Sequence, residues 1–135
     1  MSARVKKGKI KEAIPPLNIR REEWSEFLNT FSRQHHGWPV QIETHDLVTR
    51  EKVVSREMAL ESIEFDLEDE KNPRINVIVH LDNKLIKHIL FLPSQLVLRS
   101  SNYGREQSLQ VETVNTETTV HFRAPAPVPS AQLGG

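Results

Sequence analysis

Large apolar residues alternate with polar residues over most of the chain after Gly37. Successive side chains of a strand point to opposite faces, so this alternation is typical of strands that bury one face and leave the other in water. The pattern predicts strands at 40–44, 63–67, 75–81, 85–92, 95–99, 108–114 and 118–123. The pattern is weakest over 46–60, where it predicts only a short strand near 52–55. An antiparallel sheet is the fold that this pattern favours.

One amphipathic helix precedes the strands. Four large apolar residues recur at the spacing that puts them on one stripe of a helix, namely Trp24, Phe27, Leu28 and Phe31. Glutamates occupy the first turn, where the helix dipole favours anions. Gly37 can adopt a left-handed conformation and Trp38-Pro39 prevents continuation, so the helix is predicted over 21–36, with Asn18 as the nearest side chain suited to an N-cap.

The register of two hairpins can be predicted from the same alternation. A two-residue loop at 115–116 would place Leu109 opposite Phe122 and Val111 opposite Val120, with the large apolar groups on one side. A slip of one residue would turn these side chains to the other face. The loop therefore sets the register of this hairpin.

A second hairpin is predicted with its loop at 82–83. In this register Val79 lies opposite Ile86, and Val77 lies opposite His88. His88 thus joins the apolar side of the strand, where a polar group needs a partner. This position raises the alternative of a small ligand held inside the curled sheet.

The predicted fold class is α+β. We expect one N-terminal amphipathic helix packed on a curled antiparallel sheet, or partial barrel, of about six to seven strands. The expected organisation is a flexible basic arm at 1–17, a single domain at 18–123 and a disordered proline-rich tail at 124–135.

Composition excludes several classes of protein. The chain has no cysteine, so disulfides, thiolate metal sites and cysteine nucleophiles are absent. No apolar run approaches the roughly 18 residues of a membrane-spanning helix. No apolar segment follows the basic N-terminus, which argues against a secretory signal. We therefore expect a cytoplasmic protein without membrane contact.

Charge is unevenly distributed although 18 basic and 18 acidic side chains cancel. Residues 1–21 carry a net charge of +6, residues 22–72 carry −8 and residues 73–135 carry +2. Five basic side chains lie in the first eleven residues, namely Arg4, Lys6, Lys7, Lys9 and Lys11. Such an arm could contact nucleic acid in a salt-dependent way, and it could equally remain a solvated tail.

Catalytic and metal-binding patterns are not evident in the sequence. The six histidines show no H-x-x-x-H or H-E-x-x-H spacing, and no glycine-rich phosphate loop or G-x-S-x-G motif occurs. Glu64 and Asp66 fall on the polar face of an alternating strand, where solvation is expected. We therefore expect no catalytic residue, cofactor or metal, and favour a protein that is not an enzyme.

The helix and the junction after it carry a distinctive series of residues. It comprises Arg21-Glu22-Glu23-Trp24, Phe27, Phe31-Ser32-Arg33-Gln34-His35 and Gly37-Trp38-Pro39-Val40. This series resembles a family of small bacterial proteins of unknown function, most closely over residues 19–43. The resemblance implies a tryptophan-bearing helix followed by a β-rich remainder, and it implies no activity.

The same junction is the densest group of residues of the kind found at binding surfaces. Arg33, His35, His36 and Trp38 combine cations, hydrogen-bonding groups and an aromatic side chain. Their alternative role is to join the helix to the sheet. We expect a small non-enzymatic binding or adaptor module that acts through contacts with another protein. The alternatives are nucleic-acid association through the basic arm and ligand binding in a partial barrel; a homodimer is compatible with open sheet edges.

Overall fold

The computed structural model describes residues 15–125, and there a nine-stranded sheet is accompanied by one short α-helix. All strand pairs are antiparallel. The strands are β1 Leu17–Asn18, β2 Pro39–Asp46, β3 Lys52–Val54, β4 Met58–Asp66, β5 Arg74–Leu81, β6 Lys84–Phe91, β7 Gln95–Ser101, β8 Glu106–Glu112 and β9 Thr116–Arg123. The helices are η1 Arg21–Glu23, α2 Trp24–Gln34 and η2 Asn102–Gly104, of which η1 and η2 are 3₁₀ turns.

The prediction of an α+β fold with six to seven strands is therefore wrong. The described part is mostly strand, and its sheet is open, because the strands at its two ends, β1 and β6, pair with one neighbour each. β1 was not predicted, because its two residues are too few for alternation to show. The short strand predicted near 52–55 is present as β3. β1 begins at Leu17, one residue before the expected start of the domain.

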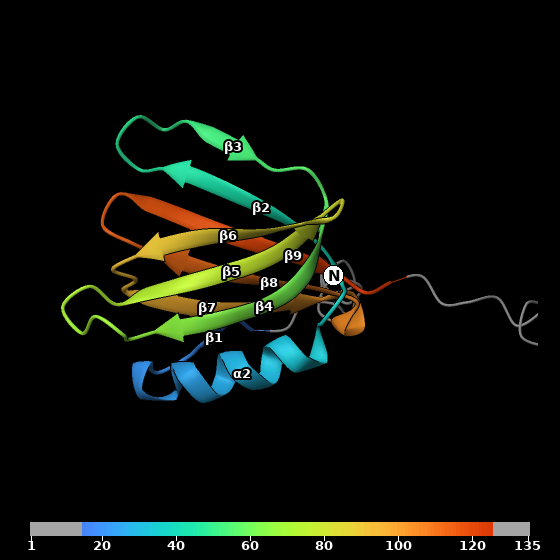
Figure 1. Cartoon of the computed structure of the whole chain (residues 1–135), viewed down its shortest axis with the longest axis horizontal. Coiled ribbons are helices and arrows are strands. Elements are labelled where there is room, and N and C mark those ends of the chain that lie inside the picture. Colours follow the sequence, from blue (N-terminus) through green and yellow to red (C-terminus); the bar gives the residue numbers. More distant parts are fainter. Residues whose placement is uncertain (1–14, 126–135) are drawn as a thin grey trace, which may run out of the picture.

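The sheet divides at β2 and curls over one core (Figure 1). Its order is β1-β7-β8-β9-β2-β4-β5-β6, and β3 also pairs with β2. The first residues of β2 pair with β4, whereas residues 43–45 pair with β3. Buried side chains from both halves of the sheet form one cluster, which includes Leu60 and Val77 on one side and Leu109 and Phe122 on the other.

Helix α2 completes the edge of β4 beyond its short pairing with β2. The Ser32 hydroxyl donates to the carbonyl of Ile63 (3.0 Å) and accepts from the Ile63 amide (2.8 Å). The Leu60 carbonyl accepts from the Gly37 amide at 2.8 Å. These bonds satisfy backbone groups of β4 that face away from β5, which fixes the helix against the sheet.

The helix begins later and ends earlier than the predicted range of 21–36. Residues 21–23 form a 3₁₀ turn, and the α-helix spans Trp24–Gln34 with His35 as its C-cap. Asn18 is not the N-cap but a residue of β1, and no side chain of residues 15–125 caps η1 or α2. Gly37 adopts a φ of 83°, in the left-handed region predicted for it.

One of the two predicted hairpin registers is confirmed. In β5–β6, Val79 lies opposite Ile86 and Val77 opposite His88, as the loop at 82–83 predicted. In β8–β9 the register differs by two residues, since Leu109 lies opposite Val120 rather than Phe122.

The turn between β8 and β9 explains the difference. The Thr113 amide donates to the Thr116 carbonyl (2.9 Å), and the two hydroxyls lie 2.8 Å apart. The two-residue loop is therefore 114–115, one residue earlier than predicted, and this moves the pairing by two residues. A shift by two residues leaves every side chain on its predicted face. Alternation alone therefore could not distinguish the two registers.

Candidate functional site

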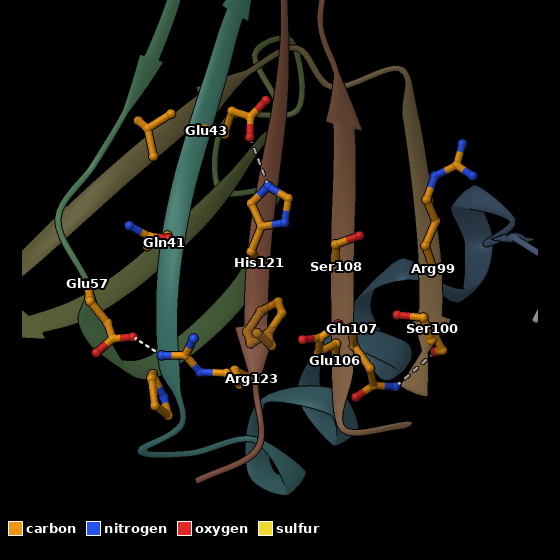
Figure 2. Close-up of a pocket in the computed structure, with 14 residues that line it drawn as sticks. Gln41, Glu43, Glu57, Arg99, Ser100, Glu106, Gln107, Ser108, His121 and Arg123 are labelled. Atoms are coloured by element: carbon orange, nitrogen blue, oxygen red, sulfur yellow. Dashed lines mark hydrogen bonds and ion pairs between the residues drawn. The ribbon is translucent and has the colours of Figure 1, made fainter. Parts of the chain in front are cut away.

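A polar hollow of about 680 Å³ lies on the outer face of the half of the sheet formed by β2, β9, β8 and β7 (Figure 2). The connection between β3 and β4 contributes one side of it through Glu57. The lining residues are Pro39, Gln41, Glu43, Val54, Glu57, Arg99, Ser100, Ser101, Glu106, Gln107, Ser108, His121, Phe122 and Arg123. Eleven of these residues are polar, and they include acidic and basic side chains. Most of the strand residues among them lie at outward positions, whereas Ser100, Gln107 and Phe122 lie at inward positions of their strands.

Acidic and basic side chains from different parts of the chain are paired across the hollow. Arg123 Nη2 lies 2.6 Å from Glu57 Oε2, and His121 Nε2 lies 3.1 Å from Glu43 Oε1 (Figure 2). Arg99 donates from Nε to the side-chain oxygen of Gln110 at 3.1 Å. Arg123 and Arg99 are exposed, so their pairs can exchange with water or with a bound partner at small cost.

Glu43 is the most connected carboxylate of the hollow. Besides His121, it is bonded by His45, whose Nε2 lies 2.5 Å from Glu43 Oε2. The hydrogen bond from His45 lowers the pKa of Glu43 below the usual glutamate value, with further lowering from His121 and against an opposing effect of burial. Glu43 therefore stays ionised to lower pH than a free glutamate and supplies a fixed negative charge to the surface.

A hydrogen-bonded series connects the hollow to the core. His35 Nδ1 donates to the Phe31 carbonyl (2.8 Å), and its Nε2 contacts Gln107 Oε1 (2.5 Å). Gln107 in turn donates from Nε2 to the Ser100 hydroxyl at 3.2 Å. The end of helix α2 thus orients two of the polar side chains that line the hollow.

The four junction residues predicted to form a surface do not lie together in solvent. His35 is only 5% exposed and stacks on Phe31, with ring centroids 3.8 Å apart. Trp38 packs edge-on against His35 at 4.4 Å and is partly buried against the core. Arg33 and His36 are exposed. The aromatic and imidazole groups of the junction therefore join helix to sheet, the alternative role considered above.

His36 belongs to a second cluster of histidines around a carboxylate. The Nε2 atoms of His80 and His36 lie 2.7 and 3.4 Å from Glu61 Oε1. The hydrogen bond from His80 lowers the pKa of Glu61. Neither this cluster nor the one at Glu43 has a metal-binding arrangement: within residues 15–125, no group of three or more His, Asp or Glu side chains is placed so that it could hold a metal ion.

Other predicted features fall partly outside the described residues. Outside them lie most of the proline-rich tail and the basic arm, with Arg4, Lys6, Lys7, Lys9 and Lys11.

His88 is half-buried on the inner face of β6, and burial lowers its pKa. No helix within residues 15–125 is long and apolar enough to cross a membrane.

The hollow was not predicted from the sequence. Most of its residues are polar positions of predicted strands, yet which of these positions adjoin depends on strand order and register. One signal was available: arginine, glutamine and serine recur at the outward positions of β7 and β8.

Comparison with known proteins places the chain in a family. A family model described as a family of unknown function, DUF5335, matches residues 16–131. The chain belongs to this family. The predicted resemblance to an uncharacterised family is confirmed at that level, while the detailed signature and the bacterial origin stay predictions.

A single stretch also resembles a curated protein. It is 46% identical over 55 residues to Protein Smg of Sodalis glossinidius (strain morsitans), a match that covers 41% of this chain and 35% of that protein. The chain thus spans about a third of the length of the curated relative that it matches. No solved structure matches the chain.

Proposed function

We propose that the protein is a non-enzymatic binding module whose hollow receives a polar segment of another protein that carries both positive and negative side chains. The observation that supports this proposal is the concentration of arginine, histidine, glutamate, glutamine and serine on one concave face. A partner of mixed charge would find a group of opposite sign for each of its own.

The existing pairs within the hollow suit exchange. Arg123 with Glu57 is an exposed ion pair, which contributes on the order of 0–1 kcal/mol to stability. A partner carboxylate could therefore replace Glu57 beside Arg123, or a partner cation could replace Arg123 beside Glu57, at little cost in free energy. Polar surfaces of this kind also support contacts that a water molecule bridges.

Most side chains of the hollow are held in place before a partner arrives. His35 fixes Gln107 from the core, and four paired strands carry most of the remaining side chains. Rigid presentation lowers the entropy lost on binding. The junction signature thus contributes to binding through position rather than through direct contact.

Binding is better supported than catalysis at the same residues. Ser108 lies opposite His121 across β8 and β9, and His121 contacts Glu43, an order that some hydrolases use. A serine nucleophile needs a base within hydrogen-bond reach. Within residues 15–125 no hydrogen bond joins Ser108 to His121, so the geometry favours a recognition surface.

The experiment is selection of partners from a phage-displayed library of random 12-residue peptides, with the whole protein as bait. We expect enriched peptides to carry both acidic and basic residues and to bind more weakly as salt is raised. Arg99→Ala should weaken the selected peptides at least tenfold. Arg33→Ala, which removes an exposed cation from α2 instead, should change their affinity less than twofold.

Two results would contradict the proposal. One is the absence of peptides that bind the protein better than they bind Arg99→Ala. The other is equal loss with Arg33→Ala, which would move the surface to the end of the helix. Both variants replace exposed side chains, so their folding can be checked by circular dichroism without ambiguity.

A further inference from the structure

Strand β6 is a long sheet edge that carries large apolar side chains in solvent. It pairs with β5 along its whole length, and its other edge has no backbone partner within residues 15–125. Leu85 is 61% exposed and Phe91 is 54% exposed. Ile86, Ile89 and Leu92, which follows the strand, are also exposed.

The other free edges of the sheet are protected in the usual way. β1 has two residues and β3 has three, and short edges offer few backbone groups to another chain. β6 has eight residues and only two of them, Lys84 and Lys87, are charged. A long, apolar and unpaired edge in a soluble chain indicates a surface that another strand covers.

We propose that β6 pairs with β6 of a second copy of this chain, antiparallel and about a two-fold axis at His88, to form a closed dimer. The sheets of the two copies then continue into one another (β6 is the yellow strand in Figure 1). This contact involves neither the hollow nor its charges.

The backbone limits the registers that two identical strands can adopt. Alternate residues of β6 direct their amide and carbonyl groups to β5, and the others direct them outward. In an antiparallel pair, residues that face each other must be of the same kind. The two-fold axis therefore passes through a residue and never between two residues.

Of the possible centres, His88 matches the side chains best. It places Leu85 opposite Phe91 of the second copy and Ile86 opposite Leu90, and each of these pairs occurs twice. Lys87 then lies opposite Ile89 of the second copy. Pairs between aliphatic and aromatic residues are among those that stabilise sheets.

The neighbouring centres are worse. An axis at Lys87 would put the two lysines opposite each other, where like charges are unfavourable. An axis at Ile89 would put Lys87 opposite Phe91 of the second copy and shorten the paired length. The apolar pattern of β6 is thus complementary to itself about one residue.

Such a contact closes on itself. Each copy offers one long free edge, so pairing two β6 strands uses both and leaves none for a third copy. A dimer is expected rather than a filament.

The first test measures the mass of the full chain in solution by sedimentation equilibrium, for the wild type and two substitutions of one residue. Ile89→Lys puts lysine opposite Lys87 of the second copy twice, and we expect it to raise the dimer dissociation constant at least tenfold. Ile89→Glu puts a carboxylate there instead, and we expect an intact dimer. Both variants add one charge at the same exposed position.

The second test reads the register directly. Because the chain has no cysteine, a single one can be introduced without background. His88→Cys should form a disulfide-linked dimer on mild oxidation, since residues facing each other at the axis lie within the span of a disulfide. Lys87→Cys should not, because the two sulfur atoms would be offset along the strands.

Several outcomes would overturn the proposal. One is a wild-type protein that stays monomeric at about 100 μM, which would indicate that another protein covers the edge. Another is a dimer dissociation constant that is the same for Ile89→Lys and Ile89→Glu. Cross-linking of Lys87→Cys as fast as His88→Cys would also overturn it.

Discussion

The two halves of the sheet have similar inner faces and different outer surfaces. The half with β4, β5 and β6 and the half with β2, β7, β8 and β9 both send Leu, Ile and Val into the same core. Outside, one half is hollowed and carries paired charges, whereas the other ends in an apolar edge at β6. Folding requires both inner faces to be apolar, whereas the outer surfaces are free to differ. The two proposed contacts, at the hollow and at β6, both rest on that difference.

The largest expected effect tests whether the halves share one core. Leu60→Ala on β4 and Leu109→Ala on β8 each truncate a fully buried side chain, and each should lower the free energy of unfolding by about 2–5 kcal/mol. Chemical denaturation followed by tryptophan fluorescence and by circular dichroism should show one coincident transition for each variant. Separate transitions for the two halves would contradict a common core, and Val114→Ala at an exposed turn is the control.

The second-largest effect is expected at the contact between helix α2 and strand β4. Ser32→Ala leaves the amide and carbonyl of Ile63 without their side-chain partner in a buried place, and the cost should be about 1–3 kcal/mol. Ser25→Ala, on an exposed face of the same helix, should be nearly neutral. Urea denaturation measures both, and equal effects would show that the Ser32 bonds do not hold the helix on the sheet.

Each half also buries one polar side chain, and the two should behave differently. Thr118 is 0% exposed, and its hydroxyl has no hydrogen-bond partner within residues 15–125. Asn76 is 1% exposed and donates from Nδ2 to Glu64 (3.0 Å) and Asp66 (3.2 Å), although its Oδ1 has no partner in the same range. Thr118→Val should leave the free energy of unfolding unchanged or raise it by up to about 1 kcal/mol. Asn76→Leu should lower the free energy of unfolding, because Glu64 and Asp66 lose their donor. Thermal unfolding of the two variants measures both effects. A loss of stability in Thr118→Val would contradict this expectation.

The smallest expected effect is on the loss of stability at acidic pH. The histidine bonds lower the pKa values of Glu43 in one half and Glu61 in the other from the ordinary 4.5. A lowered folded-state pKa contributes stability that is present above the unfolded value and is lost as pH falls through the folded one. Stability should therefore decline below about pH 4.5. Glu43→Gln and Glu61→Gln should each flatten that decline when unfolding is measured from pH 2 to 6, and together they should flatten it additively. An unchanged slope in either variant would contradict its histidine bonds.

Local patterns predicted most of the strands and one register correctly. Alternation is a property of consecutive residues, so β4 to β9 could be located from the chain alone, and the tight loop at 82–83 placed Val77 opposite His88. Alternation repeats every two residues, which is why the β8–β9 register could be wrong by that amount. The two-residue β1 is too short to show a periodic pattern, so its pairing with β7 could not be predicted from the sequence.

The candidate site depended on long-range pairing. The junction residues were correctly recognised as unusual, but their aromatic composition suits a core contact as well as a surface, and burial of His35 decides between these roles. Glu57 and Arg123 are far apart in the chain and meet because β2 lies between the connection after β3 and strand β9. Nothing local to either residue indicates the other.

The sequence by itself determined which residues face inward, where the helix stripe lies and that the chain has no thiol chemistry, because each of these follows from neighbouring residues or from composition. Tertiary structure alone decided the strand order, the division of the sheet at β2, and which polar positions share a hollow. Those features arise from hydrogen bonds between strands distant in the chain, whose energies differ little between alternative pairings until the whole core is packed.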